Sequence, residues 1–85
     1  MDIKQTPLEK IIALRDLLET NGISAEPIIY ILTKDEANQV AEDLLPTIET
    51  NDRLELARGI GKGVAWKMLD GSKVHGFKVA VNANG

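Results

Sequence analysis

The pattern Thr-x-x-Glu occurs twice in this 85-residue chain, at residues 6–9 and at residues 33–36. It forms a capping box, in which the threonine hydroxyl accepts from the glutamate backbone N–H and the glutamate carboxylate accepts from the threonine backbone N–H. Each box predicts the first turn of a helix. The first helix is expected over residues 7–20, where an Asn-Gly pair stops it, and the second over residues 33–45, before a proline.

The segments around the second helix give weaker signals. Residues 28–32 (Ile-Ile-Tyr-Ile-Leu) are apolar throughout, which predicts a strand buried on both sides. Residues 47–52 are polar and are expected to be a loop. Residues 53–58 fit either the alternation of a strand or a short capped helix, and we favour a turn of helix or irregular structure. Residues 59–63 (Gly-Ile-Gly-Lys-Gly) are expected to be a glycine-rich loop.

Asp70-Gly71 is a strong two-residue turn signal, so residues 64–69 and 72–81 are predicted to form a β-hairpin. In the register that follows, the opposed pairs include Trp66 with His75 and Val64 with Phe77. The core face is expected to carry Val64, Trp66, Met68, Phe77, Val79 and Val81. The other face is expected to carry Lys67, Val74, Lys78 and Ala80.

Together these elements predict a single α+β domain over residues 1–85, with two helices packed on a small mixed or antiparallel sheet. The expected order is helix, strand, helix, loop, β-hairpin, with residues 1–5 and 82–85 frayed. The chain has 44% hydrophobic and 27% charged residues, the balance of a folded domain. No apolar run reaches the length of a membrane helix, and the N-terminus lacks the pattern of a signal peptide, so we expect a cytoplasmic protein.

Few residues are suited to catalysis. The chain has no cysteine and one histidine, His75, so thiol chemistry is excluded and a metal site with several convergent ligands is not expected. Residues 59–63 match neither G-x-G-x-x-G nor the Lys-Ser/Thr ending of a phosphate-binding loop. The sequence therefore predicts a protein that is not an enzyme and that uses no cofactor.

Charge divides the chain unevenly. Residues 1–52 hold four basic and eleven acidic residues, and residues 53–85 hold six basic and two acidic ones, which together give the net charge of -3. The acidic candidates for a protein-binding surface are Glu9, Asp16, Glu19, Glu36, Glu42 and Asp43. The basic candidates for a nucleic-acid-binding surface are Arg58, Lys62, Lys67, Lys73 and Lys78. A third interpretation is that the two charged halves attract each other and help to close the fold.

A partial resemblance covers residues 27–82. A strand at residues 28–32 leads into a helix at residues 33–45. Residues 74–82 (Val-His-Gly-Phe-Lys-Val-Ala-Val-Asn) then follow a hairpin ending of the type aromatic or leucine, x, Gly, x, x, Val, x, Val. This order resembles the last part of the peripheral domain of tailed-phage major capsid proteins. The chain lacks the long spine helix and the extended arm of that family, so the resemblance implies a small phage or prophage accessory protein.

From these features we expect a small non-enzymatic phage-type accessory protein that binds, and inhibits or modulates, a host or viral protein. The alternatives are a nucleic-acid-binding module, with Trp66 and Phe77 as base-stacking candidates, and a small virion or assembly component. No membrane partner is expected. The last strand, residues 77–81, either pairs with residues 28–32 or forms an open edge. A homodimer through strand pairing or through an apolar helix face is therefore also expected.

Overall fold

The computed structural model describes residues 5–48 and 50–82, which form an α+β domain with four α-helices and a mixed three-stranded sheet. In chain order the elements are α1 (Pro7–Thr20), β1 (Ile29–Thr33), α2 (Lys34–Leu44), the 3-10 helix η1 (Leu45–Thr47), α3 (Thr50–Lys62), α4 (Trp66–Leu69), β2 (Lys73–Val74) and β3 (Phe77–Asn82). Of the termini predicted to fray, residues 1–4 and 83–85 lie outside the described residues. Asn82, which was also predicted to fray, is the last residue of β3. None of the described helices combines the length and apolar character needed to cross a bilayer.

Both predicted capping boxes are present. The Glu9 backbone N–H donates to Thr6 Oγ1 and the Thr6 N–H donates to Glu9 Oε1, each over 3.2 Å. The same reciprocal pair joins Thr33 and Glu36, at 3.0 and 3.2 Å. These bonds satisfy backbone donors that have no partner within the helix, and they fix the starts of α1 and α2 where the sequence predicts them.

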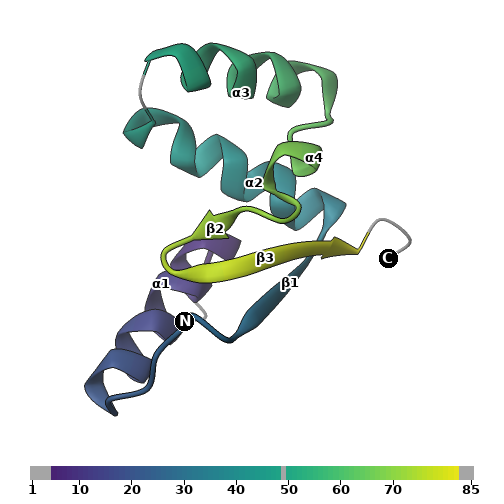
Figure 1. Ribbon diagram of the computed structural model, residues 1–85. Coiled ribbons are helices and arrows are strands. Elements are labelled where there is room, and N and C mark those ends of the chain that lie inside the picture. The colour runs from purple at the N-terminus through teal and green to yellow at the C-terminus, as the bar shows by residue number, and fades with distance from the viewer. Residues whose placement is uncertain (1–4, 49, 83–85) are drawn as a thin grey trace.

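The sheet has the order β1-β3-β2, so the last strand is the central one. β3 pairs in parallel with β1 and antiparallel with β2. The prediction that β1 is buried on both sides is wrong: Ile29 and Ile31 are 57% and 68% exposed, whereas Leu32 is buried. The cause is that the helices cover only one face of the sheet. Figure 1 shows α1 behind the sheet and the pair α2 and α3 above it, with no helix in front of β3.

α3 covers residues 59–62 of the glycine-rich run, which corrects the loop predicted at residues 59–63. The loop predicted at residues 47–52 is shorter than expected, because η1 includes Thr47 and α3 includes residues 50–52, while residue 49 lies outside the described residues. α3 begins at Thr50 and includes Gly59 and Gly61. Gly59 is needed because α3 passes close to the next segment: a Cβ there would lie 3.2 Å from Ala65 Cα. The helix ends at Lys62, and the next residue, Gly63, has a φ of 71°, the left-handed conformation that suits glycine after a helix. Residues 53–58, for which we predicted a turn of helix or irregular structure, are helical throughout.

The C-terminal hairpin exists, but the predicted turn and register are wrong. Its turn is His75-Gly76, with φ of 48° and 89°, and Val74 is the residue that opposes Phe77. Asp70-Gly71 instead joins α4 to β2, and Gly71 has a φ of 83°. Because residues 66–69 are a helical turn, Trp66 does not lie across a ladder from His75, and Val64 does not oppose Phe77.

One buried cluster lies between the sheet and the helices. Its members are Ile11, Leu32, Ala37, Val40, Ala41, Leu56, Ala65, Leu69, Val74, Phe77 and Val79. Phe77 and Val79 are therefore core residues as predicted. Val74 belongs to the core rather than to the outer face, and Met68 is 41% exposed rather than buried. Tyr30 packs against Phe77 with ring centroids 5.8 Å apart, which joins β1 to β3 on the covered face.

Candidate binding surfaces

A hollow in the described part of the chain, here called the main cleft, has a volume of about 530 Å³. It lies between η1 and the start of α3 on one side and α4 and β2 on the other. Its lining residues are Leu44, Thr47, Ile48, Asp52, Leu56, Met68, Leu69, Ser72, Lys73, Val74 and His75. This volume falls in the range of ligand-binding pockets, about 300–1,000 Å³.

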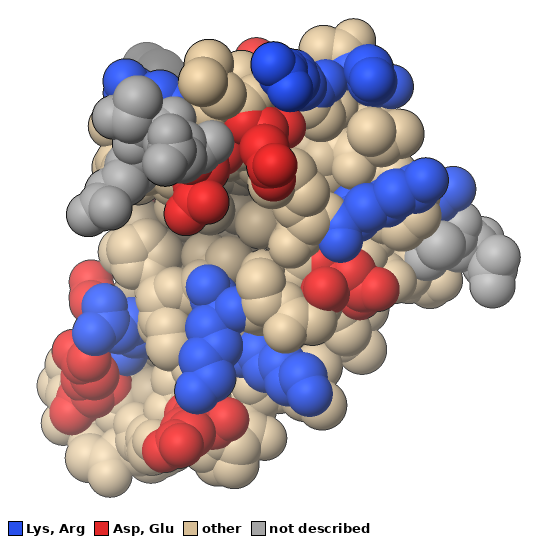
Figure 2. Space-filling model, turned by 45° about the horizontal axis from the view of Figure 1, so that its top comes forward, with Lys and Arg blue, Asp and Glu red and all other residues tan. Residues whose placement is uncertain are grey.

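The main cleft has apolar lining residues that are buried and polar ones that are more accessible. Leu56, Leu69 and Val74 are at most 7% exposed. Asp52 and Lys73 are exposed and bring one charge of each sign to the lining. Figure 2 shows uncharged surface hollowed between a red and a blue group of side chains. The cleft can therefore take an apolar group while its charged side chains contact polar groups around that group.

Met68 and His75 both line the cleft: Met68 lies on α4, and His75 directly follows β2. Met68 is 41% exposed, and its unbranched thioether can adapt to the shape of an apolar ligand. His75 occupies the first central position of the hairpin turn, with a positive φ that histidine adopts more readily than bulky or β-branched residues do. The turn, rather than a strand face, therefore sets the position of His75.

The hydroxyl of Ser72 is engaged in the backbone rather than presented to His75. Ser72 Oγ donates to the Leu69 carbonyl oxygen over 2.7 Å. A nucleophilic serine needs its hydroxyl proton directed at a base. Among the described residues, no group of three or more histidine and acidic side chains is placed to hold a metal ion.

The six acidic candidate residues do not share one role. Glu9 and Glu36 accept backbone N–H bonds in the two capping boxes, so these two carboxylates stabilise helix starts. Asp43 accepts from Gln39 Nε2 over 3.2 Å on the same helix. Asp16 and Glu42 are on α1 and α2 respectively, and neither is buried.

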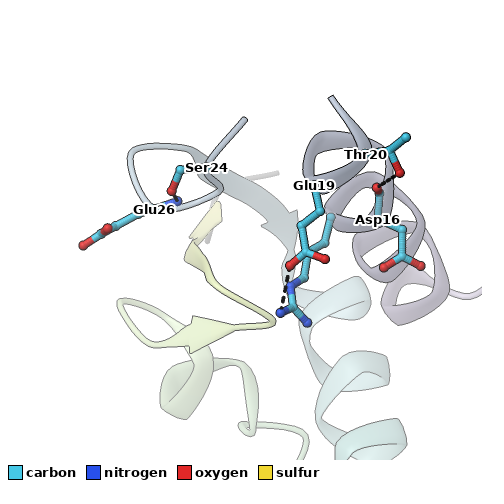
Figure 3. A network of polar contacts seen from close by, with 6 residues as sticks. Asp16, Glu19, Thr20, Ser24 and Glu26 are labelled. Carbon is cyan, nitrogen blue, oxygen red and sulfur yellow. Dashed lines mark hydrogen bonds and ion pairs between the residues drawn. The ribbon is translucent and has the colours of Figure 1, made fainter. Parts of the chain in front are cut away.

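Glu19, the sixth acidic candidate, lies beside a smaller hollow at the end of α1. It forms an ion pair of 3.1 Å with Arg15, one helical turn earlier. Figure 3 shows this pair beside the segment that carries Ser24 and Glu26. The hollow, of about 330 Å³, is also lined by Lys73 from β2. Basic and acidic side chains interleave here, as they do on the face drawn in Figure 2.

Four of the five basic candidates fall into two groups. Arg58 and Lys62 are exposed on α3, so the predicted basic glycine loop is in fact a helix. Lys73 and Lys78 are directly opposed across β2 and β3. Because their neighbours Val74 and Phe77 point into the core, these two lysines lie on the uncovered face of the sheet.

The two aromatic base-stacking candidates differ in accessibility. Phe77 is fully buried, in agreement with its place on the predicted core face, so it cannot stack on a base. Trp66 is partly exposed, and its ring is contacted by Lys67 Nζ at 5.7 Å and by Lys34 Nζ at 5.0 Å from the centroid. Trp66, Lys34 and Lys67 therefore form a cluster in which an aromatic ring and two ammonium groups are accessible together.

Sequence reasoning missed the main cleft and the exposed side of β1. The cleft collects residues from several elements that only the tertiary structure brings together. The exposure of Ile29 and Ile31 follows from the edge position of β1 and the uncovered face of the sheet, which no local pattern encodes. Asn38 Oδ1 on α2 accepts from the Trp66 N–H at 2.9 Å and so holds the start of α4, the element that brings Met68 and Leu69 to the cleft.

Comparison of the chain with protein-family models, with characterised proteins and with solved structures gave no significant match. The resemblance to the peripheral domain of tailed-phage capsid proteins therefore depends on the sequence pattern of residues 27–82 alone.

Proposed function

We propose that this chain is a non-enzymatic protein-binding domain, and that its main cleft takes an apolar side chain from a partner protein. The main cleft is the single observation that carries the proposal: a hollow of about 530 Å³ with buried apolar lining residues and an exposed charge of each sign. Full burial of one leucine-sized side chain stabilises a complex by about 1.5–3 kcal/mol. A few such anchors are typical of protein interfaces.

The charges around the cleft would select the partner. Asp52 and Lys73 come from α3 and β2, so the cleft presents a carboxylate and an ammonium from two different elements. A partner segment with opposite charges on either side of its apolar residue fits this arrangement, and charge complementarity mainly sets orientation and association rate. The carboxylates Asp16 and Glu42 would favour a partner with basic surface elsewhere. In line with the phage resemblance, we propose a host or viral protein as this partner.

A photo-crosslinking amino acid in place of Met68 tests the proposal in a lysate of the source cell. We expect this position to capture a specific protein, whereas the same amino acid in place of Leu17 should not. Leu17 is a matched control because it is 58% exposed on α1 and does not line the cleft.

The captured protein, once purified, should bind the native chain and lose about tenfold or more in affinity with Met68→Lys, the scale of one lost apolar contact. Leu17→Lys should bind as the native chain does. Equal capture at both positions, or equal affinity of the two variants, would contradict the proposed use of the cleft.

A second candidate function, nucleic-acid binding, is favoured by the cluster of Trp66, Lys34 and Lys67. A partly exposed ring beside two ammonium groups can stack a base while the lysines contact phosphate. Titration with single-stranded DNA and RNA at two salt concentrations tests it. Binding weaker than about 0.1 mM at moderate salt removes this candidate, since that is the weak end of non-specific binding.

A further inference from the structure

The outer edge of β1 is an unprotected strand edge. β1 pairs with β3 on one side, and no described strand pairs with its other side. Alternate residues of such a strand direct their N–H and C=O groups away from the sheet, where they can pair with another chain. Figure 1 shows β1 at the margin of the sheet, with no described helix or strand lying beyond it.

β1 carries none of the side chains that normally prevent pairing at a strand edge. Proteins usually protect an edge with lysine, proline or a bulge inside the strand. Residues 29–33 read Ile-Tyr-Ile-Leu-Thr and contain no charge and no proline. Ile29 and Ile31 are 57% and 68% exposed, on the sheet face away from the helices. This edge is thus both apolar and open.

We propose that β1 pairs antiparallel with β1 of a second copy of this chain, which joins the two sheets into one sheet of six strands. A second copy is the occupant because the strand is complementary to itself. A two-fold axis through Tyr30 places Ile29 opposite Ile31 of the second copy, and the reverse pair follows by symmetry. Each exposed isoleucine then contacts an isoleucine, a favourable cross-strand pair.

Charge also favours this symmetric arrangement. No acidic or basic residue occurs from Pro27 to Thr33, so two negatively charged chains can meet here without opposing like charges. Antiparallel pairing further brings the end of β1 that follows Glu26 towards the end that precedes Lys34 of the second copy. A parallel arrangement would instead place each of these residues beside its own copy.

The dimer leaves both main clefts open. The cleft is lined by β2 residues Lys73 and Val74, and β2 lies at the opposite margin of the sheet from β1. Two copies joined at β1 therefore present two clefts at the two ends of the joined sheet. A partner that offers two anchoring side chains at a matching distance would bind with increased avidity.

Sedimentation equilibrium tests the association directly. We expect the mass to rise from the 9.3 kDa chain towards twice that value between about 1 µM and 1 mM, because an interface of one strand pair is small and weak. Ile31→Lys should raise the dissociation constant about tenfold or more, since the symmetric interface loses two isoleucine contacts at once. Leu17→Lys, on an exposed helix position, should leave it unchanged. A monomer mass throughout this range overturns the proposal, and so does equal weakening by both variants.

Disulfide trapping tests the register. The native chain has no cysteine, so Ile29→Cys and Ile31→Cys each introduce a single thiol. After mixing and mild oxidation, the two variants should form a mixed disulfide well in excess of either symmetric one, because residues 29 and 31 oppose each other across the proposed axis. Circular dichroism of each variant confirms that it is folded. A statistical mixture of the three disulfides would overturn the register and the strand pairing with it.

Discussion

Gly59 and Gly61 lie two residues apart on α3, and their replacement by alanine should have opposite effects on stability. A Cβ added at Gly61 would have no neighbour within 4 Å, so the new methyl group meets only solvent. Alanine is preferred over glycine in a helix by about 1 kcal/mol, and near the helix end we expect about 0.5–1 kcal/mol. Gly61→Ala should therefore raise the melting temperature by roughly 2–8 °C for a domain of this size.

At Gly59 the same preference is opposed by a steric clash. A Cβ would lie 3.2 Å from Ala65 Cα and 3.4 Å from Ala65 N. The Ala65 backbone cannot easily move, because Val64 N–H donates to the Gly59 carbonyl over 2.8 Å and Trp66 N–H donates to Asn38 Oδ1 over 2.9 Å. Overpacking of this kind costs about 1–3 kcal/mol, which exceeds the gain in helix preference.

Urea unfolding followed by circular dichroism measures both variants on the same chain. The difference between the two free energies of unfolding removes the shared helix preference and leaves the steric cost of about 1–3 kcal/mol. Equal stabilisation by Gly59→Ala and Gly61→Ala would refute the close approach of α3 to the start of α4. Equal and negligible effects would instead indicate that residues 59–63 are the loop that the sequence predicts.

Three further sets of substitutions test the backbone and the core. Thr6→Ala and Thr33→Ala should each lower the free energy of unfolding by about 1 kcal/mol, read from the urea midpoint, because each removes a helix cap. Gly71→Ala should lower the free energy of unfolding by about 1–2 kcal/mol, because a φ of 83° disfavours any side chain. A Cβ at either Gly71 or Gly61 would have no neighbour within 4 Å, so comparing the melting temperatures of Gly71→Ala and Gly61→Ala isolates this backbone cost. Phe77→Ala should cost about 3–5 kcal/mol and weaken the near-ultraviolet circular dichroism signal, because Phe77 is fully buried.

The elements that the sequence predicts correctly are those with local signals at their ends. α1 and α2 each begin with a threonine and a glutamate that bond to each other, and this arrangement needs no contact from elsewhere in the chain. A turn of helix was allowed at residues 53–58, but the continuation of α3 through Gly59 and Gly61 was missed because glycine lowers helix preference locally. The packing of Leu56 in the core and the close approach to Ala65 compensate for that loss, and both depend on tertiary structure.

The hairpin shows how two turn signals compete. Asp70-Gly71 and His75-Gly76 both place a glycine at a positive φ, and only the second joins two strands. The alternation at residues 64–69 suits a strand, yet residues 66–69 form a helical turn that buries Leu69. Asp70 still contributes to the sheet, since its Oδ1 accepts from Val81 N–H over 3.0 Å. The hairpin register is therefore the one in which Leu69, Val74 and Phe77 are all buried in the core.

The two margins of the sheet differ in how their backbone groups are satisfied. Beyond the short β2, the Gly71 N–H donates to the Val79 carbonyl, the Val79 N–H donates to the Ser72 carbonyl, and Asp70 accepts from Val81. That side of β3 is thus closed by a loop, and the main cleft forms beside it. β1 has no such cover among the described residues, and Ile29 and Ile31 lie on the uncovered face of the sheet, where more than half of each residue is exposed. An apolar strand edge of this kind can pair with another chain, whereas the cleft can hold a single side chain, so strand pairing at β1 and anchoring at the cleft are proposed as separate contacts.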